Sequence, residues 1–410
     1  MVLRFNTDGN PDSEFGTNGK ATILGINSLV DLIVLPNGQL LALGHAQFSA
    51  NPYPGYYQRL AFIRLNSDGT PDNSVGIMGR RVVNVGSSTY PSRMKLHGDK
   101  IFVIGTEDGL PIIAKFNLDV SLDTSFSFGD GYEVWYGDPG NFIRMDIFDN
   151  GNIAVVFEDG NYHALYNFNA AGEPIVVVPI ELGSASDEIN GIKILPDGKM
   201  LINGSRAGNS RDGVLLKLND NGYADTTFGT SGLFVLDNNS GQDEAAIESV
   251  ALGNGKIITG AKLWSNSFDL GFTVTNSDGT PDAGTGQDGL IVSDLEGSQK
   301  TTCMAQQQDG KILVAGFDEN NMVLMRFDIS EVLSNPLFET GEILVYPNPA
   351  SDTITLTSLP DETAIALYTA SGQKLMESVI HGTTQLDISS LTQGVYLLRS
   401  AVGYAKIVKK

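Results

Sequence analysis

The chain has 410 residues, 41% of them hydrophobic, and this length exceeds the size at which a single core stops growing, so we expect a large folded unit and a small one. The formal charge of −22 argues against nucleic acid as a partner. No apolar run approaches the ~20 residues that a membrane-spanning helix needs. The single cysteine, Cys303, allows no intramolecular disulfide and no cysteine-based metal motif.

The first residues lack the basic and apolar regions of a signal peptide, so we expect any such peptide to have been removed or to lie upstream. From there on a motif recurs that places a basic and an apolar residue before Asn-x-Asp-Gly-x-x-Asp. Strong copies run from Arg4 to Asp12, from Arg64 to Asp72, from Lys217 to Asp225 and, without its first two residues, from Asn276 to Asp282. Weaker copies occupy 115–123 and 167–174, so the repeat is about fifty residues long.

A second motif lies between these copies and joins an Asn-Gly or Asp-Gly turn to an apolar run. It reads clearly at 35–44, 195–202 and 308–316, with degenerate versions at 96–105, 148–157 and 252–260. A turn dipeptide between short aliphatic runs predicts a β-hairpin. Each repeat is therefore two hairpins, and four short strands per unit predict a blade of a β-propeller.

The ends of the repeat region predict how the ring closes. The last copy ends with the strand 321–327 and lacks a fourth strand, whereas residues 19–24 form a strand with no blade before it. We expect residues 19–24 to complete the last blade, which gives a six-bladed ring with residues 1–18 as surplus. Seven blades remain the alternative if sequence is missing upstream.

These motifs resemble the delta-60 repeat family, whose units combine Asn-x-Asp-Gly-x-x-Asp-x-x-Phe-Gly with a Pro-Asp-Gly-Lys-Ile hairpin. Residues 12–16, 225–229 and 195–202 carry the resemblance, which covers about residues 1–330. It implies a propeller-like extracellular protein of unassigned biochemical activity.

Asparagine and aspartate in three repeat loops have a spacing like the opening of an acidic calcium loop, and calcium prefers oxygen ligands. These candidate ligands are Asn6, Asp8, Asp12, Asn66, Asp68, Asp72, Asn276, Asp278 and Asp282. The alternative is that the same side chains cap their turns by bonding to the backbone. No bidentate glutamate follows at the expected distance.

Aromatic residues suggest a ligand loop in the longest insertion, residues 46–58, where Tyr53, Tyr56 and Tyr57 lie close together. With Trp135 and Trp264 they are a candidate sugar platform, or else packing between blades. The four histidines lie at unlike places, where we expect turn or surface roles. No catalytic motif occurs, so we assign no catalytic residue.

Residues 331–341 read as a linker, and residues 342–410 as alternating strands of a small Ig-like β-sandwich. This part resembles the type A C-terminal sorting domain of the type IX secretion system. The residues that carry the resemblance are Tyr346, Pro347, Asn348, Pro349, Gly372, Gly394, Tyr396 and Lys409. It implies contact between residues 342–410 and the secretion machinery, and a secreted protein or one anchored to the outer surface; an accessory sandwich without a sorting role is the alternative.

These features favour a monomeric, non-enzymatic binding or adhesion protein for an extracellular glycan or protein, with calcium as the one candidate cofactor. A polysaccharide hydrolase or lyase with its site at the propeller channel is the alternative, and a purely structural spacer is a third. Converging carboxylates at the channel would favour the enzyme.

Overall fold

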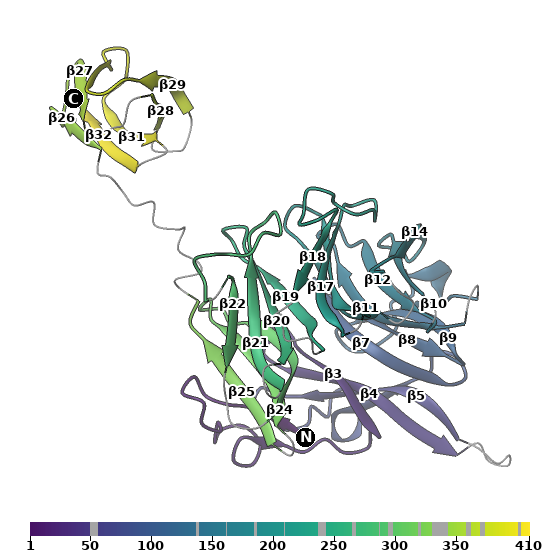
Figure 1. Cartoon of the computed structure of the whole chain (residues 1–410). Coiled ribbons are helices and arrows are strands. Elements are labelled where there is room, and N and C mark those ends of the chain that lie inside the picture. Colours follow the sequence, from purple (N-terminus) through teal and green to yellow (C-terminus); the bar gives the residue numbers. More distant parts are fainter. Residues whose placement is uncertain are drawn as a thin grey trace. The chain divides into compact units, whose positions relative to one another are not determined.

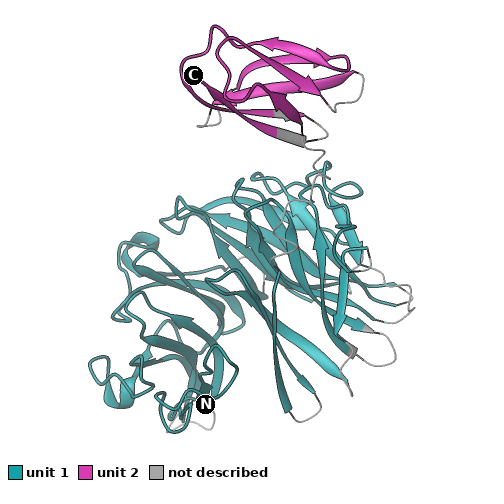
Figure 2. Cartoon of the chain, turned by 90° about the vertical axis from the view of Figure 1, so that its left-hand side faces the viewer, with its two compact units in different colours: residues 1–329 teal, residues 330–410 magenta. Residues whose placement is uncertain are grey.

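Short apolar runs ended by glycine-containing turns form strands throughout the computed structural model (Figure 1). The chain divides into two units, residues Met1–Ile329 and Ser330–Lys410, coloured separately in Figure 2. The structure describes residues 1–49, 56–136, 139–160, 162–183, 187–208, 210–236, 243–264, 268–286, 288–293, 298–318, 321–329, 343–357, 362–369, 374–400 and 403–410. The predicted linker, 331–341, lies outside these ranges.

Five four-stranded antiparallel sheets make up most of the described part of the first unit, each formed from four consecutive strands. The first two sheets contain β3 (Ser28–Val34), β4 (Leu40–Ser49), β5 (Tyr56–Leu65) and β6 (Arg80–Val83), then β7 (Thr89–His97), β8 (Lys100–Glu107), β9 (Leu110–Asn117) and β10 (Tyr132–Val134). The third contains β11 (Asn141–Ile147), β12 (Ile153–Glu158), β13 (His163–Phe168) and β14 (Pro174–Ile180). The last two contain β15 (Glu188–Ile194), β16 (Met200–Arg206), β17 (Asp212–Leu218) and β18 (Leu233–Leu236), then β19 (Ala245–Ala251), β20 (Ile257–Trp264), β21 (Phe268–Thr275) and β22 (Leu290–Ser293). Single 3₁₀ turns at Ile77–Gly79 and Ser127–Gly129 precede β6 and β10.

The first strands of successive sheets lie side by side, from β3 through β7, β11, β15 and β19 to β23 (Gln299–Gln306). Apolar side chains fill the space between neighbouring sheets. Phe62 of β5 meets Phe116 of β9 with ring centroids 5.0 Å apart, for example. A single four-stranded sheet leaves both faces open, so this stacking supplies the core.

The expected closing strand is not formed as predicted. Within residues 19–24 the structure has only β2 (Lys20–Ala21), which pairs with β1 (Val2–Leu3). In the described part of the chain, β25 (Asn321–Phe327) pairs with β24 (Ile312–Asp318) alone, so β23 to β25 form a three-stranded sheet. The loop from Arg4 to Asp12 turns the chain back on itself. Pairing of β2 with the nearby β1 therefore closes a much shorter loop than pairing with the distant β25 would.

A β-bulge interrupts the pairing of every first strand with the second strand of its sheet. In β3 the bulge brings the Ser28 carbonyl oxygen to 2.0 Å from where a Cβ on Gly44 would lie, and the Glu188 oxygen is at 2.1 Å from that position on Gly204. Gly44 ends the predicted hairpin motif 35–44, and Gly204 lies two residues beyond the predicted motif 195–202; no side chain fits opposite the bulge at either place.

The second unit has two sheets that share one core. One contains β26 (Leu344–Tyr346), β27 (Thr353–Thr357) and β30 (Thr384–Asp387), and the other contains β28 (Thr363–Thr369), β29 (Lys374–Ile380), β31 (Gly394–Ser400) and β32 (Gly403–Lys409). Ile354, Leu367 and Leu398 are among the fully buried side chains between them. None of the helices in the described ranges has the length and apolarity that a membrane crossing needs.

Candidate functional site

The predicted calcium loops hold their carboxylates in local contacts. In the second copy, Asp68 Oδ1 accepts hydrogen bonds from the Thr70 N–H at 2.9 Å and from its hydroxyl at 2.6 Å. Asp72 accepts from the Ser74 N–H at 3.0 Å through Oδ1, and its Oδ2 is 2.7 Å from Arg64 Nε. These hydrogen bonds, with Ser74 as the largest contributor, lower the pKa of Asp72 to about 2.

The other two loops repeat these contacts. Asp8 and Asp278 cap the N–H groups two residues ahead, Asp12 pairs with Arg4 at 2.7 Å, and Asp282 pairs with Lys256 at 2.8 Å. The described residues include no group of three or more His, Cys, Asp or Glu side chains that could hold a metal ion. A carboxylate that already faces an ammonium or guanidinium group fits a turn cap better than a cation site, and calcium binding stays a prediction.

The basic residue that opens each motif has a second role, which the sequence analysis missed. Arg64 Nη1 donates to the Leu118 carbonyl at 3.0 Å, and Lys217 Nζ donates to the Ser277 carbonyl at 3.2 Å, so each reaches the loop of the next sheet. Arg4 reaches Ser67 in this way, and Arg326 of β25 reaches Thr7 in the first loop. One sequence feature could have indicated this role: a basic residue stands eight positions before the last aspartate of the motif in copy after copy.

In four of the six first strands, the residue at which pairing resumes after the bulge is charged. These six residues are Asp31, Arg93, Arg144, Gly191, Glu248 and Cys303. Burial, followed by the nearby Arg93 charge, lowers the pKa of Arg144 to about 10, and burial raises the pKa of the Cys303 thiol.

The carboxylates of these first strands serve as ties between sheets. Asp31 Oδ2 accepts the Met94 N–H at 2.8 Å, Asp146 Oδ2 accepts the Ile194 N–H at 2.8 Å, and Glu248 accepts the Met304 N–H at 3.1 Å. Because a backbone donor on the next strand holds each of them, these three acids fit a structural role better than that of a mobile acid or base.

A pocket of about 700 Å³ lies where β7, β11 and β15 end. Its floor is the buried carboxylate of Asp146, with the ammonium group of Lys95 against Oδ1 and that of Lys193 at 3.9 Å from Oδ2. Both lysine side chains keep more than a third of their surface open to solvent. Phe148 and Pro196 add apolar lining and Asp149 adds a second carboxylate, so the pocket combines two ammonium groups and two carboxylates with an apolar wall.

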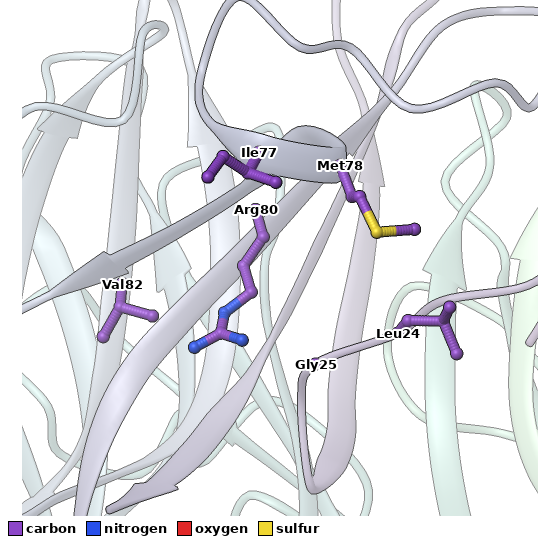
Figure 3. A pocket seen from close by; sticks show the side chains of 6 residues that line it. All are labelled: Leu24, Gly25, Ile77, Met78, Arg80 and Val82. Carbon is purple, nitrogen blue, oxygen red and sulfur yellow. The ribbon is translucent and has the colours of Figure 1, made fainter.

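A smaller pocket of about 410 Å³ lies beside the turn before β6 (Figure 3). Leu24, Ile77 and Met78 line it with exposed apolar side chains, and Ile77 is 89% exposed. Figure 3 shows the Arg80 guanidinium between Val82 and Gly25. Arg80 is the one charged residue among those that line it.

The predicted aromatic loop is described only in part. Tyr53 lies outside the described residues, while Tyr56 is 72% exposed at the tip of the β4–β5 hairpin. Tyr57 stacks on Phe48 with centroids 5.6 Å apart and carries the Arg59 guanidinium over its ring. Tyr57 therefore belongs to a packed strand end, and of the two described tyrosines Tyr56 is the one with an exposed ring.

Two other residues named in the sequence analysis lie in the interior of the first unit. Trp135 packs against Tyr166 with centroids 5.4 Å apart, as expected for contact between sheets. His163 was expected at a turn or the surface, but it lies on β13 and is 6% exposed. The neighbouring strands on both sides of β13 cover it, which a lone histidine in the sequence does not reveal.

The predicted sorting residues occupy the second unit as follows. Asn348 joins the Tyr-Pro-Asn-Pro segment to β32, since its side chain donates to the Lys406 carbonyl and accepts the Val408 N–H at 2.8 Å. The Tyr396 hydroxyl donates to the Thr392 carbonyl at 2.7 Å, and Lys409 is buried. Tyr346, Pro347 and Pro349 lie beside Asn348, Gly394 begins β31, and Gly372 lies outside the described residues.

Comparison with protein families identifies both parts. A model of the secretion system C-terminal sorting domain matches residues 344–410, and a domain of unknown function (DUF5122) β-propeller model matches residues 35–74 and 195–228. The chain is a β-propeller-like protein with a type IX secretion sorting domain. The sorting domain directs it to the cell surface or the extracellular space and implies contact with the secretion machinery.

Comparison with curated proteins finds no match for the chain. Among solved structures, similarity extends to PorZ of Porphyromonas gingivalis at 10% identity, covering 94% of this chain and 75% of that one with a TM-score of 0.30. Kuenenia stuttgartiensis hydrazine synthase is 13% identical over 91% of this chain and 68% of that one, with a TM-score of 0.44. A polysaccharide lyase family 25 ulvan lyase is 11% identical over 72% and 77%, with a TM-score of 0.42. Similarities at this level carry no argument about what the protein does.

Proposed function

We propose that this exported protein is a non-enzymatic binding module whose ligand carries a carboxylate or sulfate group. The pocket between Lys95 and Lys193 carries the proposal, because it presents two partly exposed ammonium groups in a protein of net charge −22. The two carboxylate oxygens of Asp146 form ion pairs with the two ammonium groups and hold them in position. Preorganised cations lose little entropy when they receive an anionic group.

An acidic extracellular glycan fits this pocket best. Its anionic group would face Lys95 and Lys193, while the apolar face of a sugar ring would rest on Phe148 or Pro196. The volume of about 700 Å³ suits one or two sugar residues. The alternative, a hydrolase or lyase, finds less support, since three of the four acids on the first strands, Asp31, Asp146 and Glu248, are engaged by backbone N–H groups, and the fourth, Glu188, faces Arg211.

A glycan array probed with the full chain tests this proposal. We expect retention of acidic oligosaccharides over neutral ones, weakening as salt rises, and no release of reducing ends or unsaturated products. Exchanging both Lys95 and Lys193 for Gln should weaken binding about tenfold or more. Lys374→Gln, which removes an exposed lysine of the sorting domain, is the matched control. Equal retention of neutral glycans, or turnover of any of them, would contradict the proposal.

We further propose that the ring has seven positions, one of them occupied in part by β1 and β2. The Arg326 contact to Thr7 and the Arg4 contact to Ser67 support this, because they repeat the ties that join the complete sheets. The small sandwich is proposed to be Ig-like.

A further inference from the structure

Two arginines lie on the same strands as the lysine pocket, one step further from its mouth. Arg93 stands two residues before Lys95 on β7, and Arg144 stands two residues before Asp146 on β11. The strand pairing is regular over both intervals. Residues two apart in a strand share a face and are separated by roughly 7 Å. The face that carries the pocket therefore continues to the two arginines.

The two arginines lie close enough for their charges to interact. Burial first, and the Arg93 charge second, lower the pKa of Arg144 to about 10. Their strands, β7 and β11, are neighbours in the row of first strands. Two like charges side by side raise the free energy of the site unless an opposite charge lies near both.

The row of first strands curves, so that side chains from distant sheets come near this pair. The Glu248 charge on β19 raises the pKa of Arg144, against the larger effects of burial and Arg93. Burial raises the pKa of the Cys303 thiol, and the charges of Glu248, Arg93 and Asp31 also act on it. These residues belong to the first, second, fifth and sixth sheets. The two arginines therefore point toward the concave side of the row.

Neither arginine has a carboxylate partner in the described ranges. Arg93 Nη1 donates to the Ser92 carbonyl at 2.8 Å, and Arg144 Nη1 donates to the Ile143 carbonyl at 2.9 Å. Arg144 Nε also donates to the Asn190 carbonyl. By contrast, four other arginines of the first unit pair with an aspartate or a glutamate, namely Arg4, Arg64, Arg206 and Arg211. Because a guanidinium group has five N–H donors, Arg93 and Arg144 both keep donors that no protein group receives.

These free donors are open to solvent. Both arginines are half-buried. Several buried polar atoms of the described residues lack a hydrogen-bond partner, but none of them belongs to Arg93 or Arg144. The planar guanidinium group matches the two oxygens of a carboxylate or sulfate, and contacts to backbone carbonyls hold both groups in place.

The arginine pair also decides the sign of the local charge. Asp146 and Asp149 offset the two lysines of the pocket, whereas the arginines add two positive charges with no carboxylate paired to them. The face is thus positive in a protein whose net charge is −22. An anionic group placed between the arginines would relieve their repulsion.

We propose that the ligand carries anionic groups on at least two successive sugar residues, the first held by the lysine pair of the pocket and the next by Arg93 and Arg144. This inference rests on the proposed function and names the class of glycan, a linear polyanionic chain. The offset of roughly 7 Å between the two pairs is on the scale of one sugar residue. A glycan with a single anionic group leaves one of the pairs without a partner.

Titration calorimetry of the full chain with two saccharides tests this proposal. A heparin-derived tetrasaccharide carries anionic groups on successive sugars, and an unsulfated chondroitin disaccharide carries one carboxylate. We expect the tetrasaccharide to bind at least tenfold more tightly. Arg93→Gln combined with Arg144→Gln should weaken tetrasaccharide binding about tenfold or more and disaccharide binding less than threefold. Arg81→Gln is the matched control, because Arg81 is a half-buried arginine on β6.

Two further double variants separate this inference from the function on which it rests. Lys95→Gln with Lys193→Gln should weaken the binding of both saccharides. Arg93→Lys with Arg144→Lys should bind the tetrasaccharide with an affinity between those of the natural chain and the Gln variant, because lysine keeps the charge without the planar group. Circular dichroism confirms that each variant is folded.

The outcomes are distinct. Undiminished tetrasaccharide binding by the arginine-to-glutamine variant, or equal weakening of both saccharides in it, would overturn this inference and leave the lysine pocket standing. Failure of the natural chain to bind either saccharide would contradict the proposed function and this inference together.

Discussion

At the scale of single residues, the aspartates of the repeat loops act through local contacts. Asp225 is 4% exposed, 2.7 Å from Lys199 Nζ and 2.6 Å from the Thr227 hydroxyl. These donors, with Lys199 first, lower its pKa to about 2. A depressed pKa means that the ionised carboxylate contributes stability above about pH 4, and that this contribution disappears as the pH falls through about 2.

Replacing Asp225 by Asn should therefore lower the free energy of unfolding at pH 7 by about 1–3 kcal/mol, the range for hydrogen bonds to charged groups. The difference from the natural protein should shrink as the pH falls from 4 to 2. Urea unfolding at several pH values measures it. A difference that is constant with pH would mean that the charge of Asp225 is not the stabilising feature.

Glycine has two separable roles in the same loops. Gly69 has a φ of +83°, and a Cβ there would lie 2.9 Å from the Gly16 nitrogen and from the Phe15 ring. Gly9 has a φ of +85°, but a Cβ there would meet nothing within 4 Å. Gly9→Ala should cost about 1–2 kcal/mol, the strain of the left-handed conformation. Gly69→Ala should lower the stability of the protein more than Gly9→Ala does, as measured by thermal unfolding. Equal losses of stability in the two variants would contradict a role for the close approach of Gly69 to Gly16 and Phe15.

At the scale of the elements, a phenylalanine three residues after the last aspartate of the motif joins neighbouring sheets at three places, Phe15, Phe126 and Phe228, where its ring lies against the loop glycine of the next copy. Phe228 is fully buried and shares a cluster with Leu215 and Ile257, while its ring lies 3.0 Å from where a Cβ on Gly279 would be. The Gly229 N–H donates to the Asp278 carbonyl at 2.7 Å beside it. The Phe-Gly pair is thus a contact between sheets rather than the end of a turn.

Phe228→Ala should destabilise the repeat unit by about 3–5 kcal/mol, because it leaves a cavity between two sheets. Phe128→Ala provides the control, since Phe128 is also followed by glycine but is 92% exposed. Its effect should stay within about 0.5 kcal/mol. Chemical denaturation measures the free energy of unfolding of both variants. Similar losses in the two would contradict a stabilising role for the Phe228 contact between sheets.

At the scale of the whole molecule, the two units have separate tasks. The repeat unit carries the pocket at Asp146, and the sorting domain, residues 344–410, carries the export signal. The sorting domain has its own core around Ile354 and Leu398, so it can form its recognised surface without using the strands of the repeat unit.

A chain that lacks residues 344–410 should accumulate on the periplasmic side of the outer membrane rather than at the cell surface or in the medium. Cell fractionation with antibodies to the repeat unit measures this. Asn348→Ala should lower export in part, because it removes both side-chain contacts to β32. Unchanged surface levels of the shortened chain would contradict a sorting role for this domain in its own host.

The hairpins and the secretion tag could be predicted from the amino-acid sequence. Turn residues such as Pro196, Asp197 and Gly198 act on their immediate neighbours, so the strand on either side follows from local chemistry. The secretion tag could likewise be predicted, because its motifs occur in order within residues 344–410.

Which strands pair and which charged side chains meet depends on the fold of the whole repeat unit. Residues 20 and 21 pair with β1 instead of β25, and Lys95 and Lys193 gather around Asp146 from three different sheets. Such contacts can join residues far apart in the sequence, as Arg326 and Thr7 do at a separation of 319 positions. Local patterns contain no information about them, because the geometry of neighbouring sheets decides which distant side chains come within reach.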